Sequence, residues 1–284
     1  MFSIPLWFII AGLAGFASNI FAFFNRYLLK DKDDPTVFAW YFETLRFVVC
    51  FVIAIFFDWK LTLDPRSILI FILLGLSEWI SSYFFMRMHA HSHLSISSIL
   101  SRMRLIWVPI FAFFLIAEKL TISEYIGIAV LFAGLSTVVA PRKFFIDKGA
   151  TYANLSAFFI AFNVVLVNMA LPFASNSIIC AAMSLPSVIL FPLFMKNERK
   201  RIITATKHNF LLKTGAIGIN IISLYLIAMA FRLGDASKVN AIYQGTLIFA
   251  VLAGIIFLKE RENIGRKLIG TFITLIGVLL LSST

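Results

Sequence analysis

The chain has 284 residues, of which 61% are hydrophobic and only 14% are charged. A soluble globular domain has about 45–50% apolar and about 25% charged residues, so this apolar excess cannot be hidden in one water-soluble core and must face lipid. The net charge of +11 does not indicate nucleic-acid binding, because the Lys and Arg residues form short clusters between hydrophobic runs and no nucleic-acid-binding motif is present.

Ten hydrophobic segments are long enough to cross a bilayer, which takes about 20 mainly apolar residues in a helix. In chain order they are 4–29, 36–57, 67–88, 94–117, 122–140, 151–172, 175–195, 212–231, 237–258 and 265–282. Backbone groups in lipid need internal hydrogen bonds, and these runs are continuous and not alternating, so we predict helices and exclude a β-barrel. The predicted fold is an all-α, multi-pass integral protein of the cell membrane.

The second half of the chain repeats the first. A shift of 142 residues aligns Tyr83 with Tyr225, Ser95 with Ser237 and Glu118 with Glu260, and one extra residue then aligns Gly127 with Gly270 and Gly134 with Gly277. We therefore predict two five-helix repeats, 1–142 and 143–284, which form one intertwined transport unit. Because five is an odd number of crossings, the two repeats have opposite orientations, as in secondary transporters whose substrate site lies near the midplane.

Two aligned stretches, 83–139 and 225–281, also resemble a known family. Each has a small-residue helix start, a hydrophobic span, a Glu-Lys or Glu-Arg turn and a glycine-spaced span, in LSISSILSRMRLIWVPIFAFFLIAEKLTISEYIGIAVLFAGL and ASKVNAIYQGTLIFAVLAGIIFLKERENIGRKLIGTFITLIGV. These features, with Arg46 and Pro109, resemble the EamA-type ten-helix exporters of the drug/metabolite transporter superfamily. The resemblance implies a transporter, from a superfamily whose members move amino acids, nucleotide sugars, phosphorylated sugars and drugs. Val251, where the second copy lacks the proline, departs from the pattern.

The orientation in the membrane is predicted differently by two arguments. Most Lys and Arg residues of the connections lie in the odd-numbered loops, which places those loops in the cytoplasm and both termini on the other side. The family resemblance implies the opposite, with both termini in the cytoplasm. Both orientations stay open.

Five ionisable residues lie deep within predicted spans, where a charge is costly and marks a functional or paired site. They are Glu43, Arg46, Glu78, Arg102 and Arg104. Glu43 and Arg46 are three residues apart and can pair with each other. Arg102 and Arg104 are two residues apart, and in a regular helix such residues point about 200° away from each other. We therefore expect one of them to line the cavity and the other to pair with Glu78 or Glu43. Arg102, which aligns with Gln244, is the favoured cavity residue.

The predicted substrate site combines this arginine with amides and aromatic residues of central helices. Its residues are Arg102, Gln244, Asn220, Asn19, Asn163, Tyr83, Tyr243 and Trp79. The amides can equally join helices to each other, and the aromatic residues can equally be packing or interfacial groups. Gly12, Gly15 and Gly75 are interpreted as close-packing positions.

The sequence predicts a secondary active or exchange transporter for a small anionic or zwitterionic metabolite. Three arginines against two glutamates leave the core near +1, which a carboxylate or phosphate would neutralise by bidentate binding. Glu43 and Glu78 are candidates for proton coupling, although a neighbouring arginine would keep them ionised. The alternatives are a lipid-handling, flippase-like protein and a non-transporting membrane scaffold. No enzyme and no cofactor are predicted, because nucleotide-binding and hydrolase motifs are absent. No metal site is predicted, because the histidines at 89, 91 and 93 are interpreted as a polar turn. We expect a monomer or homodimer in contact with membrane lipid.

Overall fold

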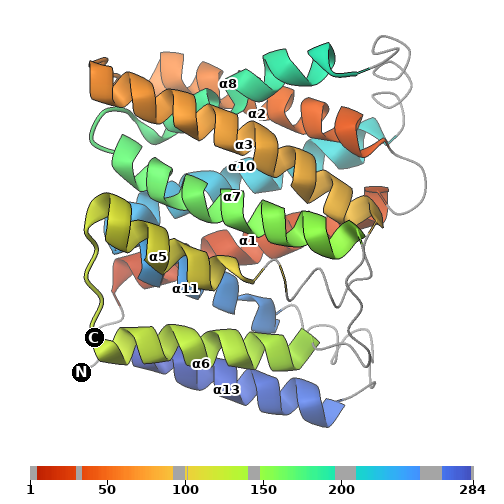
Figure 1. Ribbon diagram of the computed structural model, residues 1–284. Helices are drawn as coiled ribbons and strands as arrows, with labels where there is room; N and C mark the ends of the chain where they lie inside the picture. The colour runs from red at the N-terminus through yellow and green to blue at the C-terminus, as the bar shows by residue number, and fades with distance from the viewer. Residues whose placement is uncertain are drawn as a thin grey trace.

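The computed structural model describes residues 5–29, 34–91, 100, 102–139, 148–195, 209–249 and 264–282. Within them the chain forms ten named α-helices (Figure 1). Their bounds are α1 Leu6–Leu29, α2 Pro35–Phe57, α3 Pro65–His91, α5 Arg104–Ile116, α6 Ile122–Val139, α7 Lys148–Ala170, α8 Asn176–Leu193, α10 Phe210–Phe231, α11 Ala236–Gly245 and α13 Ile264–Ser282. The predicted all-α fold is confirmed. The side chains of the histidine run at 89, 91 and 93 lie outside the described residues.

Seven of these helices are long and apolar enough to cross a membrane: α1, α2, α3, α7, α8, α10 and α13. Two shorter apolar helices, α5 and α6, coincide with the predicted fourth and fifth spans. Helix α5 begins only at Arg104, inside the predicted span 94–117, whereas α11 coincides with the first part of the predicted span 237–258. The rest of these two predicted spans lies largely outside the described residues.

Polar caps mark where two of the helices begin. The Asp34 side chain accepts from the backbone N–H of Thr36 at 3.0 Å, directly before a proline at the start of α2. At α8, the Ser175 side chain accepts from the N–H of Ile178 at 3.3 Å. Such side chains satisfy backbone donors that have no partner inside the helix, and a proline at the first position has no N–H to satisfy.

The packing of the helices follows the inverted repeat. Figure 1 shows α2, α3 and α8 toward the top of the view, α6 and α13 side by side at the bottom, and α5 and α11 between them. Helix α1 packs on α10 as α7 packs on α3, and α1 packs on α11 as α7 packs on α5. Helix α2 packs on its equivalent in the second repeat, α8, and α6 packs on its equivalent, α13. Exchanging the two halves therefore reproduces the contacts, and the predicted architecture of two inverted five-helix repeats is confirmed.

Glycines aligned in the sequence meet across the contact between α6 and α13. A Cβ added at Gly134 would lie 2.9 Å from the carbonyl oxygen of Gly270, and one added at Gly277 would lie 2.8 Å from that of Gly127. The backbones thus approach as closely as small residues permit in lipid. Of the other glycines, Gly15 and Gly75 are close-packed as predicted, but Gly12 has no atom within 4 Å of an added Cβ, so that expectation was wrong.

Candidate functional site

A buried cluster of one arginine and two glutamates lies where α2 and α3 meet. The Arg46 Nη2 atom lies 2.5 Å from Glu43 Oε2 and 2.7 Å from Glu78 Oε1. The side chains of Glu43 and Arg46 are 0% and 2% exposed, and that of Glu78 is 10% exposed. The predicted pairing of Glu43 with Arg46 is thus present, and it extends to a second carboxylate.

Neutral polar side chains from α3, α7 and α8 complete this cluster. The Asn163 amide donates to Glu78 Oε2 at 2.5 Å, and Arg46 Nε donates to Ser184 Oγ at 2.6 Å. The hydroxyl of Ser82 donates to Glu43 Oε1, and the hydroxyl of Ser77 donates to Asn163 Oδ1. Because α2 and α3 belong to the first repeat and α7 and α8 to the second, the cluster joins the two repeats. We call Glu43, Arg46, Glu78, Asn163, Ser77, Ser82 and Ser184 the glutamate cluster.

This arrangement corrects the expected partner of the other two arginines. We expected Glu78 or Glu43 to pair with Arg102 or Arg104, but both carboxylates bind Arg46. The reason is spatial: the glutamates lie on α2 and α3, whereas α5 packs on α7, α11 and α6. Both glutamates therefore lie with Arg46, and the other two arginines lie elsewhere in the protein.

Arg102 and Arg104 lie at the beginning of α5, beside α11. Arg102 is 9% exposed, and its Nη1 lies 3.4 Å from Gln244 Oε1, a long hydrogen bond. The guanidinium of Arg104 lies 5.4 Å from the centre of the Tyr243 ring. The Nε atoms of both arginines and the Nε2 atom of Gln244 are buried and have no hydrogen-bond partner. In the described part of the chain, neither arginine forms an ion pair with a carboxylate.

The two arginines contact different side chains of α11. Arg102 lies in the turn directly before the first residue of α5. Their guanidinium groups reach Gln244 and Tyr243, two consecutive residues of α11. We call Arg102, Arg104, Tyr243 and Gln244 the arginine site.

The predicted amides divide between several places. Asn19 on α1 donates from Nδ2 to Thr246 Oγ1 at 2.9 Å, just after the end of α11. Asn220 on α10 is 8% exposed, and its Oδ1 atom has no hydrogen-bond partner. Asn163 belongs to the glutamate cluster. Asn240 on α11, which the sequence argument did not single out, is 2% exposed with an unpartnered Nδ2 atom.

Two of the predicted aromatic residues pack away from the arginine site. Trp79 stacks on Phe194 with ring centroids 5.5 Å apart. The Tyr83 ring lies 4.5 Å from the guanidinium of Arg87. Only Tyr243 contacts one of the predicted arginines among these three. The serines of the glutamate cluster were missed, although Ser184 is the position that falls on Glu43 when Arg46 is aligned with Ser187.

Polar contacts also hold the beginning of α11 against the loop between α5 and α6 and against the first turn of α6. Glu118 Oε1 accepts from the backbone N–H of Ser237 at 3.1 Å, and the Lys238 ammonium lies 2.8 Å from Glu124. Burial raises the pKa of the Glu118 carboxyl above its ordinary value, and the bond from Ser237 partly opposes this shift. These residues tie a loop of the first repeat to a helix of the second.

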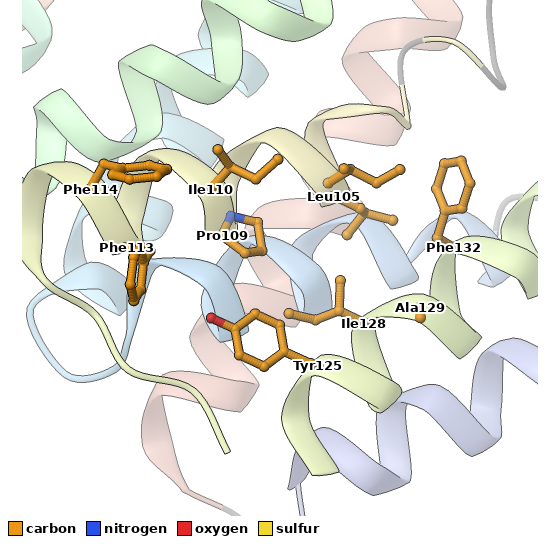
Figure 2. A pocket seen from close by; sticks show the side chains of 10 residues that line it. Leu105, Pro109, Ile110, Phe113, Phe114, Tyr125, Ile128, Ala129 and Phe132 are labelled. Carbon is orange, nitrogen blue, oxygen red and sulfur yellow. The ribbon is translucent and has the colours of Figure 1, made fainter. Parts of the chain in front are cut away.

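An apolar groove of about 510 Å³ separates α5 from α6 (Figure 2). The residues lining it are Leu105, Ile106, Pro109, Ile110, Phe113, Phe114, Tyr125, Ile128, Ala129 and Phe132. Several of them are strongly exposed, including Phe114 at 77%. Figure 2 shows the Tyr125 hydroxyl as the one side-chain oxygen among the drawn residues. The chemistry of this groove suits hydrocarbon.

The geometry can be compared with known proteins. The model of the EamA-like transporter family matches residues 5–140 and again residues 147–283. The chain belongs to the EamA-like transporter family. The two matches to the family model coincide with the two repeats, so each half is one EamA-like unit. Membership makes the protein an integral, multi-pass membrane transporter that acts on a small molecule.

Solved structures support the same fold. One of them, described as "Crystal structure of protein", has 14% sequence identity and a TM-score of 0.70, and the similarity covers 98% of this chain and 99% of that chain. At this identity the similarity to that structure shows the shared fold alone. A search of curated proteins finds no match.

Proposed function

We propose that this EamA-like protein is a secondary active or exchange transporter for a small anionic or zwitterionic metabolite, such as an amino acid, a carboxylate or a phosphorylated compound. The two inverted repeats would rock about the bound substrate and expose it to each side in turn. The arginine site would receive the anionic group, with Asn19 and Asn220 as further candidate contacts. Asn163, Tyr83 and Trp79 have other partners and are left out of this proposed site.

The observation that carries the proposal is the pair of arginines without a carboxylate partner. A guanidinium in a low-dielectric interior is costly unless an anion compensates it. The two buried glutamates of the core bind Arg46 and are not available to Arg102 or Arg104. A carboxylate or phosphate of the substrate would supply the missing charge, and the unpartnered Nε atoms and the Gln244 amide would supply donors.

A lipid-handling function is the second candidate, because the apolar groove between α5 and α6 suits an acyl chain. The two candidates require different ligands at the arginines. A soluble metabolite binds without a hydrocarbon chain, whereas a lipid needs both its phosphate and its chain. Comparing inorganic phosphate and short carboxylates with a long-chain phospholipid therefore separates them.

The test uses purified protein and a panel of carboxylates, organic phosphates, amino acids and organic cations, read first as a shift in unfolding temperature. Ligands that stabilise the protein are then tested for counterflow exchange in proteoliposomes. We expect anionic or zwitterionic compounds to stabilise it and to exchange, and cations to do neither. Arg102→Ala should abolish the stabilisation, and Arg102→Lys should retain part of it. Arg66→Ala is the matched control, since Arg66 is exposed at the beginning of α3.

Two results would overturn the proposal. The first is stabilisation and exchange of cations alone. The second is unchanged anion exchange in Arg102→Ala, which would remove the arginine site from the transport path. Stabilisation by phospholipid only would favour the lipid-handling candidate.

A further inference from the structure

The glutamate cluster contains one more carboxylate than guanidinium. Arg46 is the common partner of Glu43 and Glu78, and all three side chains are at least nine-tenths buried. With both carboxylates ionised, the cluster would hold an uncompensated negative charge inside the membrane, where such a charge is strongly disfavoured. Two carboxylates in one buried site commonly share a proton for this reason.

The other titratable side chains on the surrounding helices do not supply the missing positive charge. The thiols of Cys50 on α2 and Cys180 on α8 are buried near the cluster and carry no positive charge. The remaining groups have contacts of their own: Lys213 over the Phe38 ring, Tyr41 against Thr214, Arg87 over the Tyr83 ring, Tyr152 against Phe84, and Tyr225 near Asp58. On α1, Tyr27 is exposed. Within the described residues no second cation forms an ion pair with Glu43 or Glu78, so a proton would neutralise the cluster.

The hydrogen-bond partners distinguish the two carboxylates. Glu78 Oε1 faces Arg46, and Glu78 Oε2 accepts from the Asn163 amide at 2.5 Å and from the Ser81 hydroxyl at 3.2 Å, so three donors stabilise the ionised form of Glu78. Glu43 Oε2 faces Arg46, but Glu43 Oε1 faces the hydroxyl of Ser82. A hydroxyl can turn from donor to acceptor. Among the described residues Glu43 thus has fewer donors to stabilise its ionised form, and the Ser82 hydroxyl can accept the proton of a neutral carboxyl group at Oε1.

We propose that Glu43 carries one exchangeable proton, which its Oε1 donates to Ser82 Oγ, and that this proton is taken up and released once in each transport cycle. Glu78 stays ionised against Arg46. The coupling rests on the proposed transport function. It also rests on position, because the cluster contains the contacts of Arg46 with Ser184 and of Glu78 with Asn163, which join the two repeats. Rocking of the repeats would break these contacts and open the carboxyl to water.

The proton itself is tested on purified wild-type protein by infrared difference spectroscopy during a pH titration, without any substrate. We expect a carboxylic-acid band that titrates in the wild type and is lost in Glu43→Gln and in Glu78→Gln, because either variant leaves one carboxylate for one guanidinium. Ser81→Ala, which removes the hydroxyl beside Glu78 Oε2, should leave the band unshifted. Ser82→Ala should shift the band because the carboxyl loses its hydrogen-bond acceptor. Absence of the band in the wild type, or its survival in Glu43→Gln, would overturn the assignment. The unfolding temperature of each variant shows whether it has folded.

The coupling is tested in proteoliposomes whose membrane potential is clamped at zero. A pH difference should drive accumulation of the substrate by up to about tenfold per pH unit for one coupled proton, and the direction of flow distinguishes symport from antiport. Glu43→Gln should lose this response, while Asp64→Asn, at a half-buried carboxylate just before α3 and outside the cluster, should keep it. Net substrate uptake that ignores the pH difference in the wild type would overturn the coupling. A titrating band in a protein that moves no anion would instead refute the proposed function and leave the proton site standing.

Discussion

Arg46 of the first repeat donates from its Nε atom to the Ser184 hydroxyl of the second repeat at 2.6 Å. Aligning Arg46 with Ser187 places Glu43 on Ser184, so this arginine binds both Glu43 and the equivalent residue of the other repeat. The contact lies between α2 and α8, the two helices that the inverted repeat makes equivalent. The Arg46 side chain thus links α2 to its pseudo-symmetric equivalent α8. The charged residues of this contact lie on α2 only, since the equivalent positions of α8 are serines.

Arg46→Met should destabilise the protein strongly. It leaves Glu43 and Glu78 buried without their cation, and breaking a buried ion pair by removing one partner costs about 3–5 kcal/mol. The combined variant Arg46→Met with Glu43→Gln and Glu78→Gln should recover much of the loss, because no buried charge remains. The measurement is the unfolding temperature in detergent, with Arg66→Met at an exposed position as control. Equal losses in the two single variants would contradict the prediction.

Gly134→Ala should destabilise the contact of α6 with α13. An added Cβ would lie 2.4 Å from Thr274 Oγ1 and 2.5 Å from the Thr274 backbone nitrogen, so the helices must separate, at a cost of about 1–3 kcal/mol. Gly218→Ala makes the same chemical change where nothing lies within 4 Å. That control should be neutral or slightly stabilising, because alanine favours helix more than glycine does. The prediction fails if the unfolding temperatures of the two variants move together.

Gln244→Glu should remove anion binding at the arginine site. The Gln244 Oε1 atom lies 3.4 Å from Arg102 Nη1, so a carboxylate at this position would supply the charge that we assign to the substrate. Charge-assisted hydrogen bonds are worth about 1.5–3 kcal/mol, so anions should bind at least about tenfold more weakly. Gln244→Leu removes the amide without adding charge and should weaken binding less. Affinities measured by anion-dependent thermal shift decide this, and equal affinities in the two variants would argue against the assignment.

Glu118→Gln should change how stability depends on pH. Burial raises the pKa of the Glu118 carboxyl, so the folded protein holds this proton more tightly than the unfolded chain does. The contribution to stability is therefore largest below the ordinary carboxyl pKa and is lost as the pH rises through the raised value. The glutamine variant should lack this loss, and its advantage over the wild type should grow from acidic to neutral pH. Unfolding temperatures across that range provide the test, and a constant difference at every pH would refute the explanation.

Much of the fold could be predicted because a lipid bilayer restricts which secondary structures can span it. Continuous apolar runs must become helices in a bilayer, and the glycines aligned at 134 and 277 mark the contact of α6 with α13. The pairing of Glu43 with Arg46 could also be predicted, since both lie on one helix three residues apart. The partner of Glu78 could not, because it depends on which helix packs beside α3. The contacts of Arg102 and Arg104 could not be predicted either, because they depend on which helix packs beside α5.

Composition and internal repetition in the sequence predict that this protein lies in the membrane, that it is built from two inverted repeats, and that the ionisable residues of its spans lie almost entirely in the first of them. How this charge is divided depends on helix packing: two carboxylates surround Arg46 at the contact between the repeats, and two arginines beside α11 have no carboxylate partner in the described part of the chain. The physical reason is that helix formation in lipid follows from local composition. Pairing of charges requires side chains from different helices to lie within a few ångströms, which only helix packing can arrange.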